Sequence, residues 1–249
     1  MSETFDTSTE SARSDAISAA GEAIKQGQAV VLPTDTVYGI GVDAFSPEAV
    51  TLLLAAKGRN REMPPPVLIG RANVMDALAA DISEAARKLA DAFWPGGLTI
   101  ILYAQPSLAW DLGETRGTVA LRIPADQTAL DLLQAVGPMA VSSANRTAMP
   151  AATTASEAKS MLADSVAVYL DDGQRNSIEP STIVDCTQEP PKVVREGSVP
   201  LHELRTVVQE VLGIDEDTPA PDSTEDQAVG QSAPEATGSP EQTSETDEK

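Results

Sequence analysis

The chain has a single cysteine and a single histidine, and these two scarcities exclude several kinds of functional site. One cysteine, Cys186, allows neither an internal disulfide nor a zinc site built from several cysteines. It lies in an alternating apolar and polar pattern, which is typical of a small buried strand residue rather than a nucleophile. The histidine, His202, falls in the first turn of an expected C-terminal helix. A Ser-His-Asp triad and a histidine metal cluster are therefore excluded.

Aromatic residues and long apolar runs are also scarce. Only 3% of the residues are aromatic, so a core drawn from the 41% hydrophobic residues must consist mainly of Ala, Val, Leu and Ile. No apolar run approaches the roughly 20 residues that span a bilayer. Residues 1–15 are rich in Ser, Thr and Glu and lack the apolar stretch of a signal peptide. We therefore expect a cytoplasmic protein without membrane association.

Basic residues are few, since the chain has 17 Lys and Arg residues but 38 Asp and Glu residues, which gives a net charge of −21. Residues 215–249 hold 11 of the acidic residues and one basic residue. Generic adhesion to nucleic acid needs a basic surface and is not expected here. A small anion can still bind where cations cluster locally.

Composition divides the chain into three parts. Residues 215–249 consist mostly of Pro, Ser, Thr, Glu and Gly, and residues 1–10 are similar. Such segments bury too little apolar surface to offset chain entropy, so both are predicted to be disordered. Residues 11–214 have the length of one α/β domain.

Apolar runs of strand length alternate with helical patterns in this middle part. Strands are predicted at residues 28–32, 67–69, 98–103, 118–123, 139–142, 166–170, 182–185 and 192–194. Helices are predicted at residues 16–25, 47–56, 83–92, 126–136, 154–162 and 200–212, with Ser46 and Thr154 as N-caps. Adjacent strands late in the chain favour a mixed parallel and antiparallel sheet with helices packed on it.

Polar motifs follow or interrupt several of these apolar runs. Residues 31–41 begin as a buried strand, break at Pro33 and continue as a loop of hydroxyls, a carboxylate and a phenol. Further motifs with small hydroxyls or a cation are Lys57-Gly58-Arg59, Arg122-Ile123-Pro124, Ser142-Ser143-Ala144-Asn145, Ser181-Thr182-Ile183-Val184-Asp185 and Arg195-Glu196-Gly197. A polar site distributed in this way suits a phosphate-bearing ligand.

Lys57, Arg59 and Arg61 put three cations within five positions, on a loop that prolines stiffen. An Arg fork and a compact Lys charge suit phosphates or a carboxylate. Alternatively, the same cations compensate the dipole at the C-terminus of the preceding helix.

Two further motifs each allow a structural explanation. Residues 142–145 follow a strand, where open α/β sheets bind ligands, but Ser and Asn also form ordinary turns. Arg122 lies between apolar strand residues and needs an anion, which either the protein or a ligand can supply. Residues 93–97 are interpreted as a packed turn.

The familiar nucleotide fingerprints, a Walker-type loop and Gly-x-Gly-x-x-Gly, are absent from the sequence. No carboxylate pair or suitably placed histidine indicates general acid–base chemistry. The motifs instead favour positioning and charge neutralisation.

Taken in order, the motifs resemble the YrdC-type threonylcarbamoyl-adenylate synthases in their single-domain form. The resemblance runs from about Ile17 to Leu212 and rests on the segments 33–39, 57–59, 94–96, 122–124, 143–145, 181–185 and 195–197. It implies a twisted mixed sheet with packed helices and a concave substrate site. It also implies an enzyme that makes threonylcarbamoyl-adenylate and diphosphate from L-threonine, bicarbonate and ATP.

The resemblance further implies roles for individual residues. Threonine is expected to contact Thr34, Arg122, Ser143 and Ser181. ATP is expected to contact Lys57, Arg59, Arg61, Thr118, Asn145, Thr153 and Arg195, with Mg²⁺ arriving with ATP and held partly by its phosphates. Met63 replaces a Lys or Asn that is common in the family, which shifts a phosphate contact to Arg61 or removes it.

Partner proteins that move the threonylcarbamoyl group to tRNA, next to the anticodon, are implied as well, with tRNA itself bound indirectly or weakly. Two other functions are alternatives to this one. The first is an RNA-binding or regulatory module that uses the same fold without catalysis. The second is hydrolysis of an acylated phosphate, for which the sequence offers no obvious base.

Overall fold

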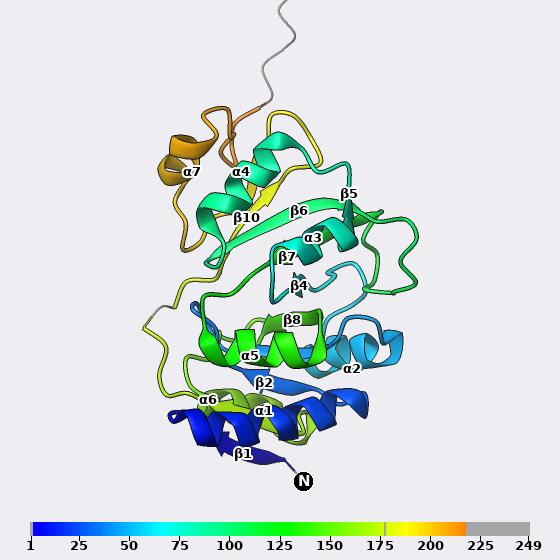
Figure 1. Cartoon of the computed structure of the whole chain (residues 1–249), viewed down its shortest axis with the longest axis vertical. Coiled ribbons are helices and arrows are strands. Elements are labelled where there is room, and N and C mark those ends of the chain that lie inside the picture. The colour runs from blue at the N-terminus through cyan, green and yellow to red at the C-terminus, as the bar shows by residue number, and fades with distance from the viewer. Residues whose placement is uncertain (1, 177, 218–249) are drawn as a thin grey trace, which may run out of the picture. The chain divides into compact units, whose positions relative to one another are not determined.

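Eleven strands within the described residues of the computed structural model, 2–176 and 178–217, form one sheet in the order β1-β9-β2-β3-β8-β4-β7-β6-β10-β11, with β5 paired to β6 (Figure 1). Four neighbouring pairs on this path are parallel, β1–β9, β9–β2, β4–β7 and β6–β10, and the others are antiparallel. The sheet is therefore mixed, as the sequence predicts. The strands are β1 (Glu3–Asp6), β2 (Val30–Leu32), β3 (Gly39–Asp43), β4 (Val67–Leu68), β5 (Ala79–Ala80), β6 (Leu98–Ala104), β7 (Thr118–Arg122), β8 (Met139–Ser143), β9 (Val168–Asp171), β10 (Thr182–Asp185) and β11 (Lys192–Arg195).

The helices begin at side-chain caps in most cases. Ser46 Oγ accepts from Ala49 N at 3.3 Å, and Thr154 Oγ1 accepts from Glu157 N at 3.1 Å, so both predicted caps are confirmed. The helices are α1 (Glu10–Lys25), α2 (Pro47–Lys57), α3 (Asn73–Leu78), α4 (Glu84–Phe93), α5 (Gln127–Val136), α6 (Ala155–Leu162) and α7 (Leu201–Val207), with a 3₁₀ turn, η1, at Ala163–Ser165.

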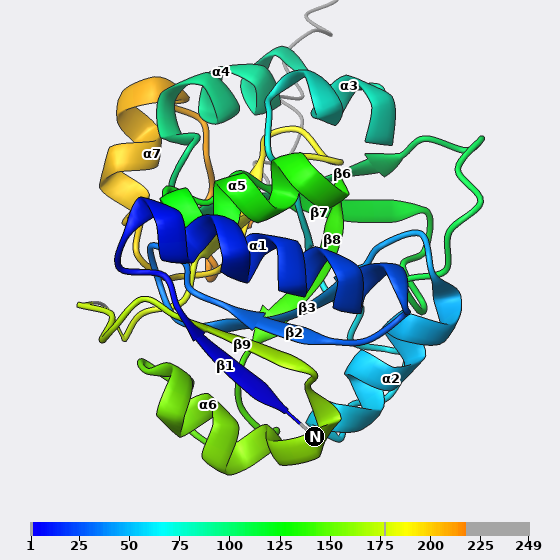
Figure 2. The same cartoon turned by 60° about the horizontal axis from the view of Figure 1, so that its bottom comes forward.

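Successive side chains along the central strands point to opposite faces of the sheet, and a hydrophobic core lies on each face. In β2, Val30 and Leu32 pack with the buried residues of α1 and α5, whereas Val31 belongs to the larger core on the other face. Figure 2 shows α1 and α5 side by side across the strands. The larger core includes the buried residues of α2, α4 and α6. Polar side chains on these strands must therefore find partners or line a cavity.

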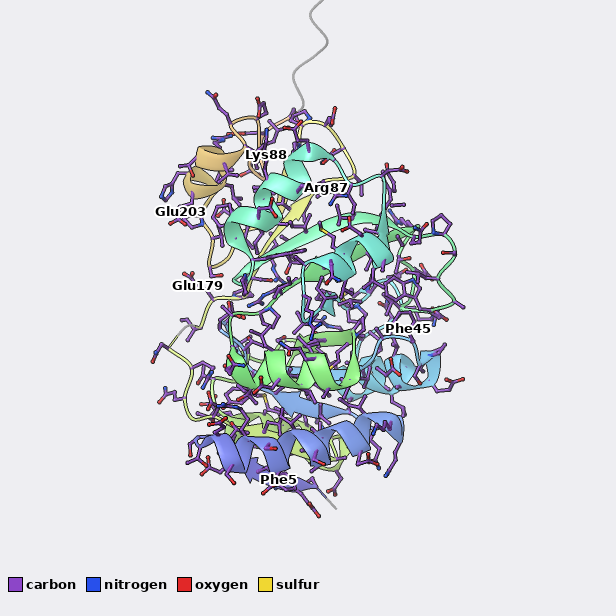
Figure 3. All side chains as sticks on the ribbon, in the orientation of Figure 1. Phe5, Phe45, Arg87, Lys88, Glu179 and Glu203 are labelled. Atoms are coloured by element: carbon purple, nitrogen blue, oxygen red, sulfur yellow. The ribbon has the colours of Figure 1, made fainter. Side chains whose placement is uncertain are left out.

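The prediction that residues 1–10 are disordered is wrong for most of them. Glu3–Asp6 forms β1, an edge strand parallel to β9, and α1 already begins at Glu10. Phe5 packs against the smaller core (Figure 3). An edge strand is held mainly by backbone hydrogen bonds, to which a polar composition gives no clue.

The C-terminal boundary moves by a few residues. The helix predicted at 200–212 ends at Val207, and Leu212 instead bridges to Lys192 of β11. Glu216 accepts from Gly213 N at 2.9 Å, so ordered contacts extend past the predicted boundary at Ile214. The remainder of the predicted tail, 218–249, lies outside the described residues. Within the described part of the chain, none of the helices has the length and apolarity to cross a membrane.

Candidate active site

A small cavity of about 120 Å³ brings together residues from segments far apart in the chain. Its walls come from the β2–β3 loop, the loop after α2, strands β4 and β6, the ends of β7 and β8, the segment just before β10 and the end of β11. Of the residues predicted for threonine and ATP, those that line it are Thr34, Arg59, Arg122, Ser143, Ser181 and Arg195. Pockets for drug-sized ligands are about 300–1,000 Å³, so this cavity suits a smaller molecule.

Arg122 has an anionic partner supplied by the protein. Its Nη2 donates to Asp35 Oδ1 at 2.7 Å, and the pair is almost buried, with side-chain exposures of 7% and 18%. Nε donates to Gly96 O at 2.9 Å and Nη1 to Thr36 Oγ1 at 3.1 Å. The turn at residues 93–97 thus packs as predicted and also holds the arginine. These bonds use three of the five N–H groups of a guanidinium, so two remain for a ligand.

Arg59 and Arg195 differ from Arg122, since neither forms an ion pair within residues 2–176 and 178–217. Arg59 donates to Ser142 Oγ at 3.0 Å, while its buried Nε has no hydrogen-bond partner. Burial lowers the pKa of the Arg59 guanidinium, and burial together with the charges of Arg122 and Arg59 lowers the pKa of Arg195. Three cations with one carboxylate leave the cavity positively charged and suited to an anion.

Arg195 forms hydrogen bonds with Ser181, the residue immediately before β10. The arginine belongs to the exposed part of β11, but its guanidinium reaches inward, where Nη2 donates to Ser181 O at 2.7 Å and to Ser181 Oγ at 3.0 Å. Gly197 allows its segment to pack closely against residues 180–181, because a Cβ at this position would collide with the backbone of Pro180 and Ser181. The motif Arg195-Glu196-Gly197 therefore positions Ser181 in the cavity wall.

A first pair of hydroxyls, those of Thr34 and Thr36, donates both of its hydrogens within the protein. Thr34 Oγ1 donates its one hydrogen to Val37 O at 2.6 Å. It lies 3.0 Å from Thr36 Oγ1, which must therefore be the donor in that contact, and it also accepts from Thr36 N. A hydroxyl has one hydrogen and two lone pairs, so the hydroxyl of Thr34 has neither a hydrogen nor a lone pair left for a ligand. Thr34 lines the cavity but cannot offer a ligand its hydroxyl hydrogen in this arrangement.

Lys57 and Asn145 lie behind this wall. Lys57 is 1% exposed, and its Nζ donates to Ser143 O, to Asn145 O at 2.7 Å and to Asn145 Oδ1 at 3.1 Å. Burial and the neighbouring charge of Arg59 lower the pKa of Lys57 to about 7. The three acceptor oxygens belong to the end of β8 and the loop after it, so the hydrogen bonds of Lys57 fix the backbone of Ser143 on the side away from the cavity.

The other predicted ATP contacts do not line the cavity. Arg61 is exposed and donates to Asp111 Oδ1 at 2.6 Å, across the loop between β6 and β7. Thr118 donates to Thr115 O at 2.8 Å, at the base of the same loop. Thr153 Oγ1 lies 3.0 Å from Glu157 Oε2, at the start of α6.

The segment after β9 forms a network of ion pairs and hydrogen bonds that the sequence does not predict. Arg175 pairs with Asp126 at 2.9 Å and with Asp172 at 2.8 Å, and its guanidinium lies over the ring of Tyr38. Tyr38 Oη in turn donates to Gly173 O at 2.6 Å. Tyr38 lines the cavity, so this network braces one wall of the site. A lone arginine in a Gly- and Asn-containing segment gives no pattern from which to predict it.

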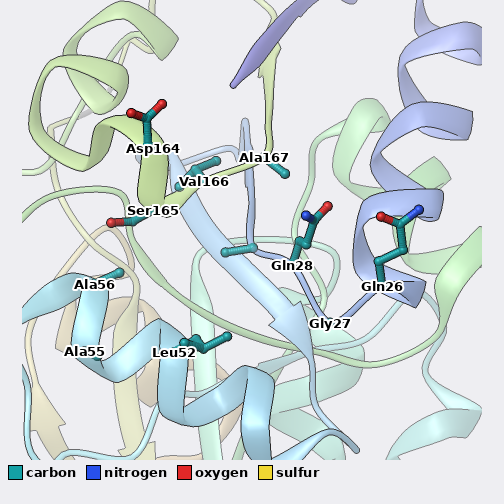
Figure 4. A pocket seen from close by; sticks show the side chains of 11 residues that line it. Gln26, Gly27, Gln28, Leu52, Ala55, Ala56, Asp164, Ser165, Val166 and Ala167 are labelled. Atoms are coloured by element: carbon teal, nitrogen blue, oxygen red, sulfur yellow. The ribbon is translucent and has the colours of Figure 1, made fainter. Parts of the chain in front are cut away.

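A larger hollow, about 550 Å³, lies between the end of α1, helix α2 and η1 (Figure 4). Its lining has one charged side chain, Asp164, and consists otherwise of small, amide and apolar residues such as Gln26, Gln28 and Leu52. It contains none of the predicted site residues. The smaller cavity has the cations and hydroxyls that ligand chemistry requires, and we identify it as the candidate active site.

Comparison with known proteins agrees with this geometry. A Sua5/YciO/YrdC family model, described as "Telomere recombination", matches residues 22–197 and so includes every residue that lines the cavity. The chain belongs to this family. Among curated Sua5/YciO/YrdC proteins, a putative threonylcarbamoyl-AMP synthase of Mycobacterium tuberculosis is 50% identical over 215 residues, which are 86% of this chain and 97% of that protein.

Solved structures of the family share the fold. The structure of Pyrococcus abyssi Sua5 complexed with L-threonine superposes with a TM-score of 0.80 at 32% identity over 86% of this chain. The present chain spans 62% of the length of that protein. Escherichia coli YciO, at 24% identity, matches with a TM-score of 0.74 and supports the fold alone.

Proposed function

We propose that this protein is a threonylcarbamoyl-AMP synthase, which joins L-threonine, bicarbonate and ATP and releases diphosphate. The observation that carries the proposal is the convergence of Arg59, Arg122 and Arg195 on one small cavity lined by hydroxyls. Relatives with this name include the mycobacterial protein, which is 50% identical over 86% of this chain.

The chemistry of the reaction explains why such a cavity is needed. A C–N bond forms between the threonine amine and the carbon of bicarbonate, with loss of water. A P–O bond then forms between the new carboxylate and the α-phosphorus of ATP, and diphosphate leaves. All of the groups that meet are anionic or carry a carboxylate, so they repel one another in water. Fixed guanidinium groups lower that repulsion and orient the reacting oxygens.

The structure suggests a division of labour among the arginines. The two remaining N–H groups of Arg122 suit a small carboxylate inside the cavity. Arg59, half-buried on the loop after α2, and Arg195, on the exposed end of β11, suit the phosphates or the carboxylate formed during the reaction. The cavity is too small for a whole nucleotide, so the adenosine must lie outside it.

Mg²⁺ enters this proposal as part of the substrate. No group of three or more His, Cys, Asp or Glu side chains among residues 2–176 and 178–217 is arranged to hold a metal ion. Phosphate oxygens of ATP are ordinary Mg²⁺ ligands, so the ion would arrive as the MgATP complex. The product is an activated acyl group, which partner proteins would transfer to tRNA in the cytoplasm.

The competing idea of an RNA-binding module fits the site less well. An RNA platform presents its cations on the surface, where phosphates of the backbone reach them. Here Arg122 is buried and bonded to a carboxylate, and only Arg195 of the three belongs to the exposed residues.

Omission of single substrates tests the proposal. The purified chain with MgATP, L-threonine and bicarbonate should release diphosphate and form threonylcarbamoyl-adenylate, which mass spectrometry detects. Leaving out threonine or bicarbonate should abolish the release. The control variant Thr128→Val changes a buried threonine of α5 that does not line the cavity, and it should remain active. Equal diphosphate release without threonine would contradict the proposed reaction.

A further inference from the structure

A second pair of hydroxyls, those of Thr99 and Ser181, also lines the cavity. Thr99 lies on β6 between Leu98 and Ile100, which point into the larger core, so alternation turns Thr99 to the other face. Thr99 is 1% exposed and lines the cavity together with Ser181. β6 and β10 are parallel neighbours, as Figure 1 shows, and Thr182 N donates to Gly97 O at 2.9 Å. The backbone thereby fixes the two hydroxyls next to each other.

Hydrogen-bond accounting shows that this pair, unlike the first, keeps one hydrogen. Thr99 Oγ1 and Ser181 Oγ are 2.7 Å apart, and Arg195 Nη2 donates to Ser181 Oγ at 3.0 Å. One of the two hydroxyls donates to the other, and within the described residues neither has a further acceptor. Whichever hydroxyl is the internal donor, the hydrogen of its neighbour remains for a ligand.

In one of these two arrangements Thr99 donates to Ser181, and Ser181 then offers the free hydrogen to a bound anion. Arg195 occupies one lone pair of Ser181, and a hydrogen from Thr99 would occupy the second. Ser181 is then a saturated acceptor whose own hydrogen is directed away from both donors, into the cavity. An anionic oxygen placed there would meet the hydroxyl of Ser181 beside the charge of Arg195.

We propose that Thr99 is a positioning residue, which with Arg195 orients the hydroxyl of Ser181 toward an acceptor oxygen of the amino-acid substrate. The inference rests on the proposed function, because L-threonine is the substrate whose oxygen is received. It goes further by assigning a role to a buried residue of β6. Thr99 acts through Ser181, so the effects of changing the two residues must be coupled.

Isosteric substitution separates the hydroxyl from the shape of the side chain. Thr99→Val removes the hydroxyl that orients Ser181 and should raise the KM for L-threonine about tenfold, because the hydrogen bond from Ser181 to a charged oxygen is weakened, while kcat stays within about twofold. Thr99→Ser restores the hydroxyl and should stay within about twofold of wild type. Thr128→Val, a buried threonine elsewhere, should leave the KM unchanged.

A double-mutant cycle tests whether Thr99 acts through Ser181. Calorimetric titration with L-threonine should give a Kd about tenfold higher for Thr99→Val in the wild-type background. In the Ser181→Ala background the same change should alter the Kd less than about twofold. Should Thr99→Val fail to fold, as a melting curve would reveal, Thr99→Ala and its combination with Ser181→Ala take its place in the cycle.

Three results would overturn the inference. A Thr99→Val variant with unchanged affinity for threonine shows that the hydroxyl has no positioning role. An equal loss in the Ser181→Ala background shows that Thr99 acts independently of Ser181. If the wild-type chain neither binds threonine nor uses it, the proposed function fails first, and this inference fails with it.

Discussion

Arg122 and Arg59 line the same cavity, yet the protein neutralises the first and leaves the second without a counter-charge. Arg122 bonds to Asp35, and both side chains are nearly buried. Arg59 bonds to a serine hydroxyl, and its buried Nε has no partner. A buried cation with a carboxylate is part of the folded structure, whereas a desolvated cation without one lowers stability until an anion binds. The two arginines should therefore respond to mutation in opposite ways.

The largest effect is expected for Arg122→Leu, which leaves the carboxylate of Asp35 without its partner. Removing one member of a buried ion pair costs about 3–5 kcal/mol, so the free energy of unfolding should fall by that order. Denaturant titration measures the loss. The double variant Arg122→Leu, Asp35→Asn is the control, because the asparagine oxygen can still accept from Ala125 N and no charge is left unpaired. It should regain a large part of the stability. Similar stability of Arg122→Leu and wild type would mean that the pair contributes little.

Arg59→Leu should do the reverse, with a large loss of activity and little loss of stability. Loss of a charged hydrogen bond to the reacting groups costs about 1.5–3 kcal/mol, or roughly 10- to 100-fold in kcat/KM for MgATP. The melting temperature should stay the same or rise, because a buried and unpaired group has been removed. Calorimetry and diphosphate release on the same sample check both parts. A clear drop in melting temperature with normal kcat/KM would return Arg59 to a structural role.

Lys57 offers a test through pH. Its pKa is lowered from 10.5 to about 7 in the folded protein, so between these values the unfolded chain binds more protons than the folded one. The contribution of Lys57 to stability is therefore present above about pH 10.5 and is lost as the pH falls toward 7. The difference in the free energy of unfolding between wild type and Lys57→Met should grow in favour of wild type from pH 7 to 10, by on the order of 1 kcal/mol per pH unit at most. A difference independent of pH would show that the lysine stays charged, held by its ring of carbonyl oxygens.

The smallest effect is expected for Arg61→Ala, although the sequence motif groups Arg61 with Arg59. Arg61 and Asp111 are about half exposed, and such surface pairs are worth less than about 1 kcal/mol. The melting temperature should change by no more than a degree or two, and the KM for ATP should stay within about twofold. The same result is expected for Asp111→Ala. A tenfold rise in this KM for Arg61→Ala alone would show that the arginine leaves Asp111 to contact ATP.

Motifs in which polar residues end an apolar run supply side chains that the fold brings together. Arg59, Arg122, Ser143 and Ser181 belong to such motifs and all of them line the cavity, while their contacts with threonine or ATP stay predictions. The sequence does not separate neighbours on one loop, since Arg59 lines the cavity whereas Arg61, two positions on, pairs with Asp111 outside it. Thr99 was missed although it carries a signal, a single hydroxyl within the apolar run Leu98–Leu102. Asp35 was in a recognised motif, but its partner is 87 residues away.

The sequence by itself determined the mixed order of strands and helices, the caps of α2 and α6 and the chemical character of the site. These features depend on local patterns, namely the spacing of apolar residues, the hydroxyls before helices and the cations after them. Only the tertiary structure decided which arginine receives a carboxylate, which pair of hydroxyls keeps a hydrogen and whether residues 3–6 form a strand. Each of these depends on pairing between residues distant in the chain, and hydrogen-bond valence is settled only when both partners are in place.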